Sequence, residues 1–138
     1  MKILIIDDDA SKRALLINAL EQFGVTASNI DQATSALSAR KIFSAKTFDL
    51  VILDLVLPAT DRSGNQSAEI GFGLLQELSD EGVAKRIVGA TAHAEALAEY
   101  ESGFRDMTEQ LLLVSPTTSE WKESLRALVM QANSLAER

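Results

Sequence analysis

The chain lacks cysteine, has a single histidine, His93, and contains only 5% aromatic residues among its 138 positions. Without cysteine it forms neither a disulfide framework nor a thiolate metal site. His93 has no histidine partner for a metal, so we expect it in a surface loop. No apolar run approaches the ~20 residues of a membrane-spanning helix, and no signal-peptide pattern precedes the first apolar run. These absences favour a cytoplasmic protein that does not contact the membrane.

Positive charge is also in short supply. The chain has thirteen lysines and arginines and twenty aspartates and glutamates, which gives a net charge of −7. Such a balance argues against direct nucleic-acid binding and fits cations or basic protein partners. Hydrophobic residues make up 46% of the chain, enough to bury a real core. The length is usual for one domain, so we expect residues 1–138 to form a single domain.

Short apolar runs alternate with helical patterns along the chain. Strands are predicted at residues 2–6, 26–33, 48–54, 86–90 and 111–114, of which 26–33 is weakly apolar and fits a sheet edge. Helices are predicted at residues 11–23, 35–44, 72–78 and 94–100. A last helix, capped by Thr117 or Thr118, aligns Trp121, Leu125, Leu128, Ala132 and Leu135. Polar residues 59–71 are predicted to form an exposed loop, and residues 103–110 an extended connection.

This alternation predicts an α/β fold. The expected architecture is a single doubly wound, five-stranded parallel sheet with helices on both faces. Right-handed crossovers leave few possible topologies for such a chain. In open sheets of this kind, ligands bind beyond the carboxyl ends of the strands. The residues that follow the strands are therefore the candidate site.

Polar residues follow four of the predicted strands. Asp7, Asp8 and Asp9 follow the first, Asp54 ends the third, Thr91 follows the fourth and Ser115 the fifth. A buried charge such as Asp54 is costly unless it is paired or metal-bound. Carboxylates brought together need a cation among them, and hard oxygen ligands suit Mg²⁺. The sequence thus predicts an acidic metal site in which Asp54 can act as a carboxylate nucleophile toward phosphorus.

Simpler explanations exist for several of these residues. Asp7 to Asp9 also fit a solvated helix N-terminus, where acidic side chains are favoured by the helix dipole. We expect Asp9 to serve only as a loop and cap residue. Thr91 also fits an ordinary N-cap, and Ser115 an ordinary turn residue. The convergence of separate strand ends on one edge favours the site over these alternatives.

With these residues the chain resembles the receiver domain of bacterial response regulators. The resemblance rests on Asp7-Asp8, Asp54 with Pro58, Thr91-Ala92 and Ser115-Pro116. It implies that Asp54 is the phosphoacceptor in phosphorelay signalling, with no enzyme activity of another kind. It further implies that Mg²⁺ (or Mn²⁺) is held by Asp7, Asp8, Asp54 and the backbone carbonyl of Val56. Thr91 and Ser115 would contact or sense the phosphoryl group.

The resemblance also implies partners. The phosphoryl group would come from a sensor histidine kinase or a phosphotransfer protein, and a downstream effector protein would respond. The family also uses one helix–strand face for homodimers, although no residue here selects it. Because no output domain follows the last helix, we expect a stand-alone receiver.

The main departure concerns a lysine. Receivers carry a lysine directly before the proline after the fifth strand, and here that position is Ser115. A serine hydroxyl has no charge and cannot replace the ion pair with the aspartate. Lys41, Lys46 and Lys85 have no position that predicts a substitute role. We therefore expect an atypical receiver with slow phosphorylation.

Two rival functions remain at this point. The first is a pseudo-receiver, a protein-interaction module that is not regulated by phosphorylation; the missing lysine favours it. The second is a haloacid-dehalogenase-like phosphatase, because Asp7-Asp8-Asp9-Ala10-Ser11 fits the Asp-x-Asp-x-Ser/Thr start of that family. The second alternative needs a later lysine and a further acidic pair, for which the last helix leaves little room.

Overall fold

The computed structural model describes residues 1–62, 65–105 and 110–136. Its centre is a five-stranded sheet in the order β2-β1-β3-β6-β7, with every neighbouring pair parallel. The strands are β1 (Ile3–Ile6), β2 (Ile30–Ala33), β3 (Phe48–Asp54), β6 (Ala84–Thr91) and β7 (Gln110–Leu113). The predicted doubly wound parallel sheet is confirmed, with β2 at one edge as expected.

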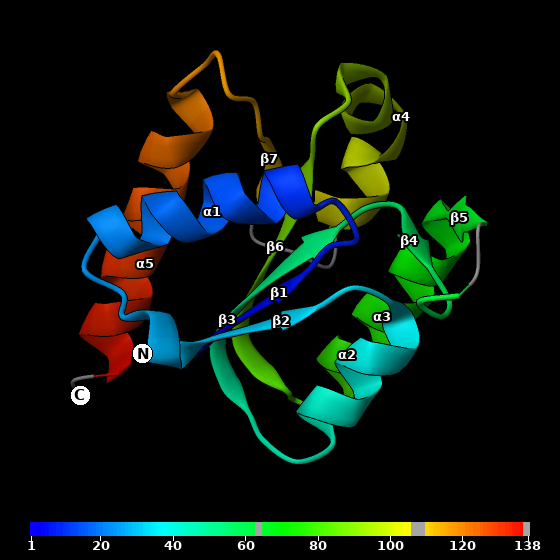
Figure 1. Cartoon of the computed structure of the whole chain (residues 1–138), viewed down its shortest axis with the longest axis horizontal. Helices are drawn as coiled ribbons and strands as arrows, with labels where there is room; N and C mark the ends of the chain where they lie inside the picture. Colours follow the sequence, from blue (N-terminus) through cyan, green and yellow to red (C-terminus); the bar gives the residue numbers. More distant parts are fainter. Residues whose placement is uncertain (63–64, 106–109, 137–138) are drawn as a thin grey trace.

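Helices cover both faces of the sheet (Figure 1). They are α1 (Ala10–Gln22), α2 (Ala36–Phe43), α3 (Ala68–Asp80), α4 (Ala94–Arg105) and α5 (Glu120–Ala136). On one face, Leu16 and Leu20 of α1 and Trp121 and Leu125 of α5 pack on a cluster that includes Ile5 and Ile52. The alternate residues of the same strands therefore face the other side, because successive strand side chains point to opposite faces.

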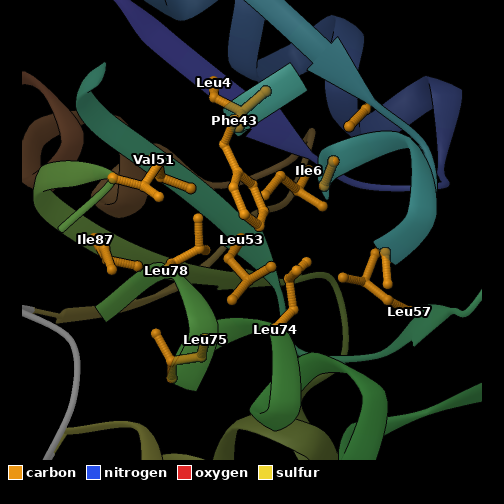
Figure 2. Close-up of a cluster of buried hydrophobic side chains, with 14 of the residues drawn as sticks. Leu4, Ile6, Phe43, Val51, Leu53, Leu57, Leu74, Leu75, Leu78 and Ile87 are labelled. Atoms are coloured by element: carbon orange, nitrogen blue, oxygen red, sulfur yellow. The ribbon is translucent and has the colours of Figure 1, made fainter. Parts of the chain in front are cut away.

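The second face is covered by α2 and α3. Figure 2 shows the ring of Phe43 of α2 pointing toward Leu53, with Leu74, Leu75 and Leu78 of α3 in the same cluster. All three leucines are fully buried. Since both faces of β1 and β3 are covered, residues 3–6 and 50–53 are continuous apolar runs rather than alternating ones.

Several predicted boundaries are wrong. Residues 27–29 form a 3₁₀ turn before β2 rather than strand, and the last helix begins at Glu120, after both threonines expected to cap it. The α4 helix continues to Arg105, five residues beyond the prediction, whereas residues 106–109 lie outside the described part of the chain. The side chain of Leu135 also lies outside it, while Trp121, Leu125, Leu128 and Ala132 are buried as expected.

The largest correction concerns residues 59–71, predicted to be an exposed loop. Residues 59–62 and 65 do lie outside helices and strands, but Gln66–Ser67 (β5) pairs with Leu57–Pro58 (β4) in a two-stranded antiparallel ribbon. The α3 helix then begins at Ala68, with the Ser67 hydroxyl accepting from the Ile70 amide at 3.2 Å. Pro58 is the last residue of β4 and takes part in the ribbon. In Figure 1 this ribbon lies beside the carboxyl edge of the main sheet.

Candidate functional site

A pocket of about 340 Å³ opens at the carboxyl edge of the sheet. Its lining combines the ends of β1, β3 and β6 with α1 and the β5 strand. The lining residues are Asp8, Asp9, Lys12, Asp54, Val56, Gln66, Thr91, Ala92 and His93.

Parallel strand pairing brings the acidic residues to the same edge of the sheet. Ile6 of β1 pairs with Leu53 of β3, so Asp7 and Asp54 follow directly on adjacent strands. Asp7 is 1% exposed and Asp54 7%. Asp7, Asp8 and Asp54 each offer a carboxylate oxygen, and these oxygens lie within 4.8 Å of one another. The predicted meeting of these three side chains is thus present in the structure.

A lysine that the sequence analysis overlooked lies among these carboxylates. Lys12 is 4% exposed, and its Nζ lies 2.9 Å from Asp7 Oδ2 and 3.1 Å from Asp54 Oδ1. The expectation of a site without a lysine is therefore wrong. This lysine belongs to α1 and is none of Lys41, Lys46 and Lys85.

The start of α1 explains how Lys12 reaches the site. Asp9 caps the helix by accepting from the amides of Ser11 at 2.9 Å and Lys12 at 3.3 Å, as expected for a cap residue. Lys12 then falls in the first turn, four residues before Leu16 and eight before Leu20. All three share the buried face of the helix. This spacing was a readable signal, because it puts a lysine on an otherwise apolar stripe.

Burial and mutual charge shift the acid–base behaviour of the cluster. Burial raises the pKa of Asp54 to about 7, against the opposing effect of the Lys12 charge. Burial likewise raises the pKa of Asp7 above its ordinary value, with Lys12 again opposing. Burial alone would lower the pKa of Lys12, but the Asp54 and Asp7 carboxylates outweigh it and raise that pKa. Lys12 is therefore charged at neutral pH, and it serves two carboxyl groups that each resist ionisation.

The hydrogen bonds of the two buried carboxylates are unequal. Asp54 Oδ1 accepts from the Val56 amide at 3.3 Å and also pairs with Lys12, and both of these contacts leave its Oδ2 unengaged. Asp7 Oδ1 accepts from the Asp9 amide at 2.9 Å. Asp7 Oδ2 is buried without a hydrogen bond and has only the Lys12 ion pair. An oxygen of this kind is a natural ligand for a cation or water.

The β4–β5 ribbon supplies a second residue that the sequence analysis did not identify. The side-chain amide of Gln66 donates a short hydrogen bond to Asp8 Oδ2. Gln66 also lines the pocket. No periodicity marks Gln66 in the sequence, and only the ribbon pairing brings it to the site.

Thr91 and Ser115, the predicted phosphoryl-contacting residues, lie in different surroundings. Thr91 is buried, lines the pocket, and accepts from the His93 amide at 3.2 Å through its Oγ1. Ser115 is absent from the described pocket lining, and its hydroxyl shares a hydrogen bond with Thr117 at 2.9 Å. The structure brings Thr91 to the acidic cluster and leaves Ser115 outside it.

The donor set suits a hard divalent cation. Three carboxylate groups converge, with one oxygen of each within 4.8 Å of the others. Mg²⁺ prefers such oxygen ligands and keeps several waters, for which the pocket has room. The residues present therefore fit the metal that the sequence predicts.

Fold and site together define a class: a doubly wound α/β domain with an acidic, cation-binding type of pocket at its carboxyl edge. The sequence model described as "Response regulator receiver domain" matches residues 3–108. The chain belongs to this family, whose members are phosphoryl-accepting modules of two-component signalling. Receiver domains bind Mg²⁺ at an aspartate cluster of this kind. The family match removes the support for the phosphatase alternative.

Individual relatives agree with the family. The chain is 34% identical to the uncharacterized protein y4jS of Sinorhizobium fredii, over 88% of this chain and 30% of that protein. It is 25% identical to the DNA-binding transcriptional regulator NtrC of Escherichia coli, over 94% of this chain and 27% of that protein. The chain spans less than a third of the length of each of these relatives.

Solved structures show the same fold. The response regulator TrrA of Thermotoga maritima, crystallised with Mg²⁺ and BeF, is 28% identical with a TM-score of 0.67, covering 93% of this chain and 99% of that one. The receiver domain of NtrX from Brucella abortus has a TM-score of 0.70 at 22% identity, covering 95% of this chain and 97% of that one.

None of the helices in the described residues is both long and apolar enough to cross a membrane.

Proposed function

We propose that the domain, residues 1–138, accepts a phosphoryl group on Asp54. The observation that carries this proposal is the convergence of Asp7, Asp8 and Asp54 around the buried ammonium of Lys12. Lys12 and the Val56 amide both hold Oδ1 of Asp54, which leaves Oδ2 unengaged by these two contacts. One oxygen is thus oriented and the other is available for attack.

The proposed step is a phosphoryl transfer. Asp54 Oδ2 forms a bond to phosphorus, and the phosphorus–nitrogen bond of a phosphohistidine donor breaks. The imidazole leaves with the electron pair, and the product is an aspartyl phosphate. When bound, Mg²⁺ (or Mn²⁺) supplies positive charge beside the phosphoryl oxygens. Asp7 and Asp8 would hold the ion with Asp54 and the Val56 carbonyl, and the Thr91 hydroxyl would donate to a phosphoryl oxygen.

The partners follow from this chemistry. Receiver domains interact with histidine kinases and effector domains. For this chain we propose a sensor histidine kinase or phosphotransfer protein as donor and an effector protein as reader, in the cytoplasm. Homodimer formation is a further part of the proposal.

Intact-mass measurement after treatment with acetyl phosphate and Mg²⁺ tests the proposal. The wild type should gain one phosphoryl group, and Asp54→Asn should gain none. Asp49→Asn is the matched control, because Asp49 is on the same strand but pairs with Lys85 at 3.1 Å, away from the pocket. Labelling that persists in Asp54→Asn rejects Asp54 as acceptor. No labelling of the wild type favours the pseudo-receiver alternative. The first argument for that alternative was the missing lysine, and the presence of Lys12 weakens it.

A further inference from the structure

Lys12 is the feature of this site that the family pattern does not account for. We infer that Lys12 is a catalytic residue of the phosphoryl transfer, replacing from α1 the positive charge that Ser115 cannot provide. The inference rests on the function proposed for Asp54. Its basis is the contact of Lys12 Nζ with Asp54 Oδ1, 3.1 Å away, on the carboxylate that would attack phosphorus.

Stability alone does not explain a lysine at this position. The buried face of α1 is otherwise formed by Leu16, Ala19 and Leu20. Burying an ammonium costs several kcal/mol, and replacing buried ion pairs with well-packed apolar residues is often neutral or stabilising. A leucine or methionine at residue 12 would continue the apolar stripe. The charged group is therefore better explained by what it contacts than by packing.

The excess of acidic groups around the pocket explains why a positive charge is needed there. The carboxyl groups of Asp7, Asp8 and Asp54 lie near the single charge of Lys12, and Asp9 also lines the pocket, so acidic groups outnumber basic ones. Among the described residues that line the pocket, Lys12 is the only lysine or arginine. An incoming phosphoryl group adds further negative charge to this surface. A fixed cation at the attacking carboxylate lowers the electrostatic cost of bringing two anions together.

The geometry also fits a role after attack. Lys12 lies on Oδ1, so it does not block the lone pairs of Oδ2. A phosphorus bonded to Oδ2 puts its own oxygens near the same ammonium, which then pairs with the product. Because Lys12 lines the open pocket as well as contacting Asp54, its ammonium is within reach of a bound group.

The test compares Lys12→Met with the wild type in two measurements. Methionine keeps the length and helix compatibility of the side chain without its charge. Labelling by acetyl phosphate with saturating Mg²⁺, followed by intact mass, should slow at least tenfold. Mg²⁺ affinity measured by calorimetry should rise roughly tenfold, because one positive charge near the ion is removed. Opposite changes in the two measurements distinguish loss of a catalytic charge from a loosened fold, which would weaken both.

Two further variants complete the test. Lys12→Arg keeps the charge and should recover much of the labelling rate, whereas Lys41→Met, on the exposed side of α2, should behave as the wild type. Equal labelling of Lys12→Met and wild type overturns the inference and leaves the proposed function intact. Parallel loss of labelling and metal affinity in Lys12→Met also overturns it, as a structural effect. If the wild type itself fails to label, the proposed function is what has failed.

Discussion

Gln66 donates a hydrogen bond to Asp8 across 58 positions of the sequence, which joins the β4–β5 ribbon to the acidic pocket. The same segment is fixed at its other end, because the Ala59 carbonyl accepts from the Leu37 amide at 2.9 Å and Asp61 accepts from the Thr34 hydroxyl at 2.5 Å. The segment therefore spans from the start of α2 to the pocket. A cation that binds Asp8 Oδ2 would have to compete with the Gln66 amide.

Gln66→Ala tests this competition. Removing the amide frees Asp8 Oδ2, so we expect Mg²⁺ to bind up to about tenfold more tightly, in line with the loss of one hydrogen bond to a charged group. Calorimetry measures the change. Gln76→Ala is the matched control, because Gln76 donates to Asp80 at 2.8 Å on the exposed side of α3. Weaker binding by Gln66→Ala alone would show instead that the glutamine assists the ion.

Gly71 and Gly73 give a paired prediction for α3. A Cβ at Gly71 would lie 2.3 Å from the carbonyl oxygen of Leu55, whereas one at Gly73 would meet nothing within 4 Å. Gly71→Ala should therefore lower the free energy of unfolding by about 1–3 kcal/mol, because backbone next to Asp54 must shift. Gly73→Ala should raise it by about 0.5–1 kcal/mol through helix propensity. Chemical denaturation measures both, and equal effects at the two positions would contradict the packing described here.

Ser115 gives a prediction in which the structure and the family pattern disagree. The pattern assigns Ser115 to the phosphoryl group, but its hydroxyl bonds Thr117 and its carbonyl accepts from Trp121 Nε1 at 2.8 Å. Ser115→Ala keeps that carbonyl, so labelling by acetyl phosphate should stay within about threefold of wild type and stability within about 0.5 kcal/mol. Trp121→Phe removes the donor and should cost about 1–3 kcal/mol of stability. A large labelling defect in Ser115→Ala would restore Ser115 to the site.

The sequence predicted the sheet and the acidic cluster because both depend on local signals. Apolar runs such as residues 48–54 mark buried strands, and parallel pairing then carries Asp7 and Asp54 to one edge. Lys12 is not predicted by such signals, because charged residues on helices are usually solvent-exposed. Gln66 was beyond such reasoning, since the pairing of Pro58 with Gln66 depends on tertiary docking of a polar segment.

The raised pKa of Asp54 predicts an unusual dependence of stability on pH. In the metal-free protein this pKa is about 7, because burial outweighs the charge of Lys12, whereas an unfolded aspartate titrates near its ordinary value of 3.8. Between these values the folded state binds more protons than the unfolded state, so this group's stabilising contribution is complete at low pH and is lost as pH rises through 7. The Asn side chain of Asp54→Asn does not ionise, so this variant does not lose stability through this group as pH rises. Its advantage over the wild type in free energy of unfolding should therefore grow from about pH 4 to about pH 7 and level off above that.

Asp49→Asn is the control for that measurement, and its stability relative to the wild type should not change with pH across this range. Burial acts to raise the pKa of Asp49, but the Lys2 amide and Lys85 outweigh it and lower that pKa below its ordinary value. Its contribution is present above the unfolded pKa and is lost only in acid, so Asp49→Asn should be less stable than wild type by a constant amount across the same range. Denaturation with chelator present separates the two patterns. An Asp54→Asn advantage that stays flat with pH would mean that Lys12 holds Asp54 ionised throughout, with the acid's pKa near its ordinary value.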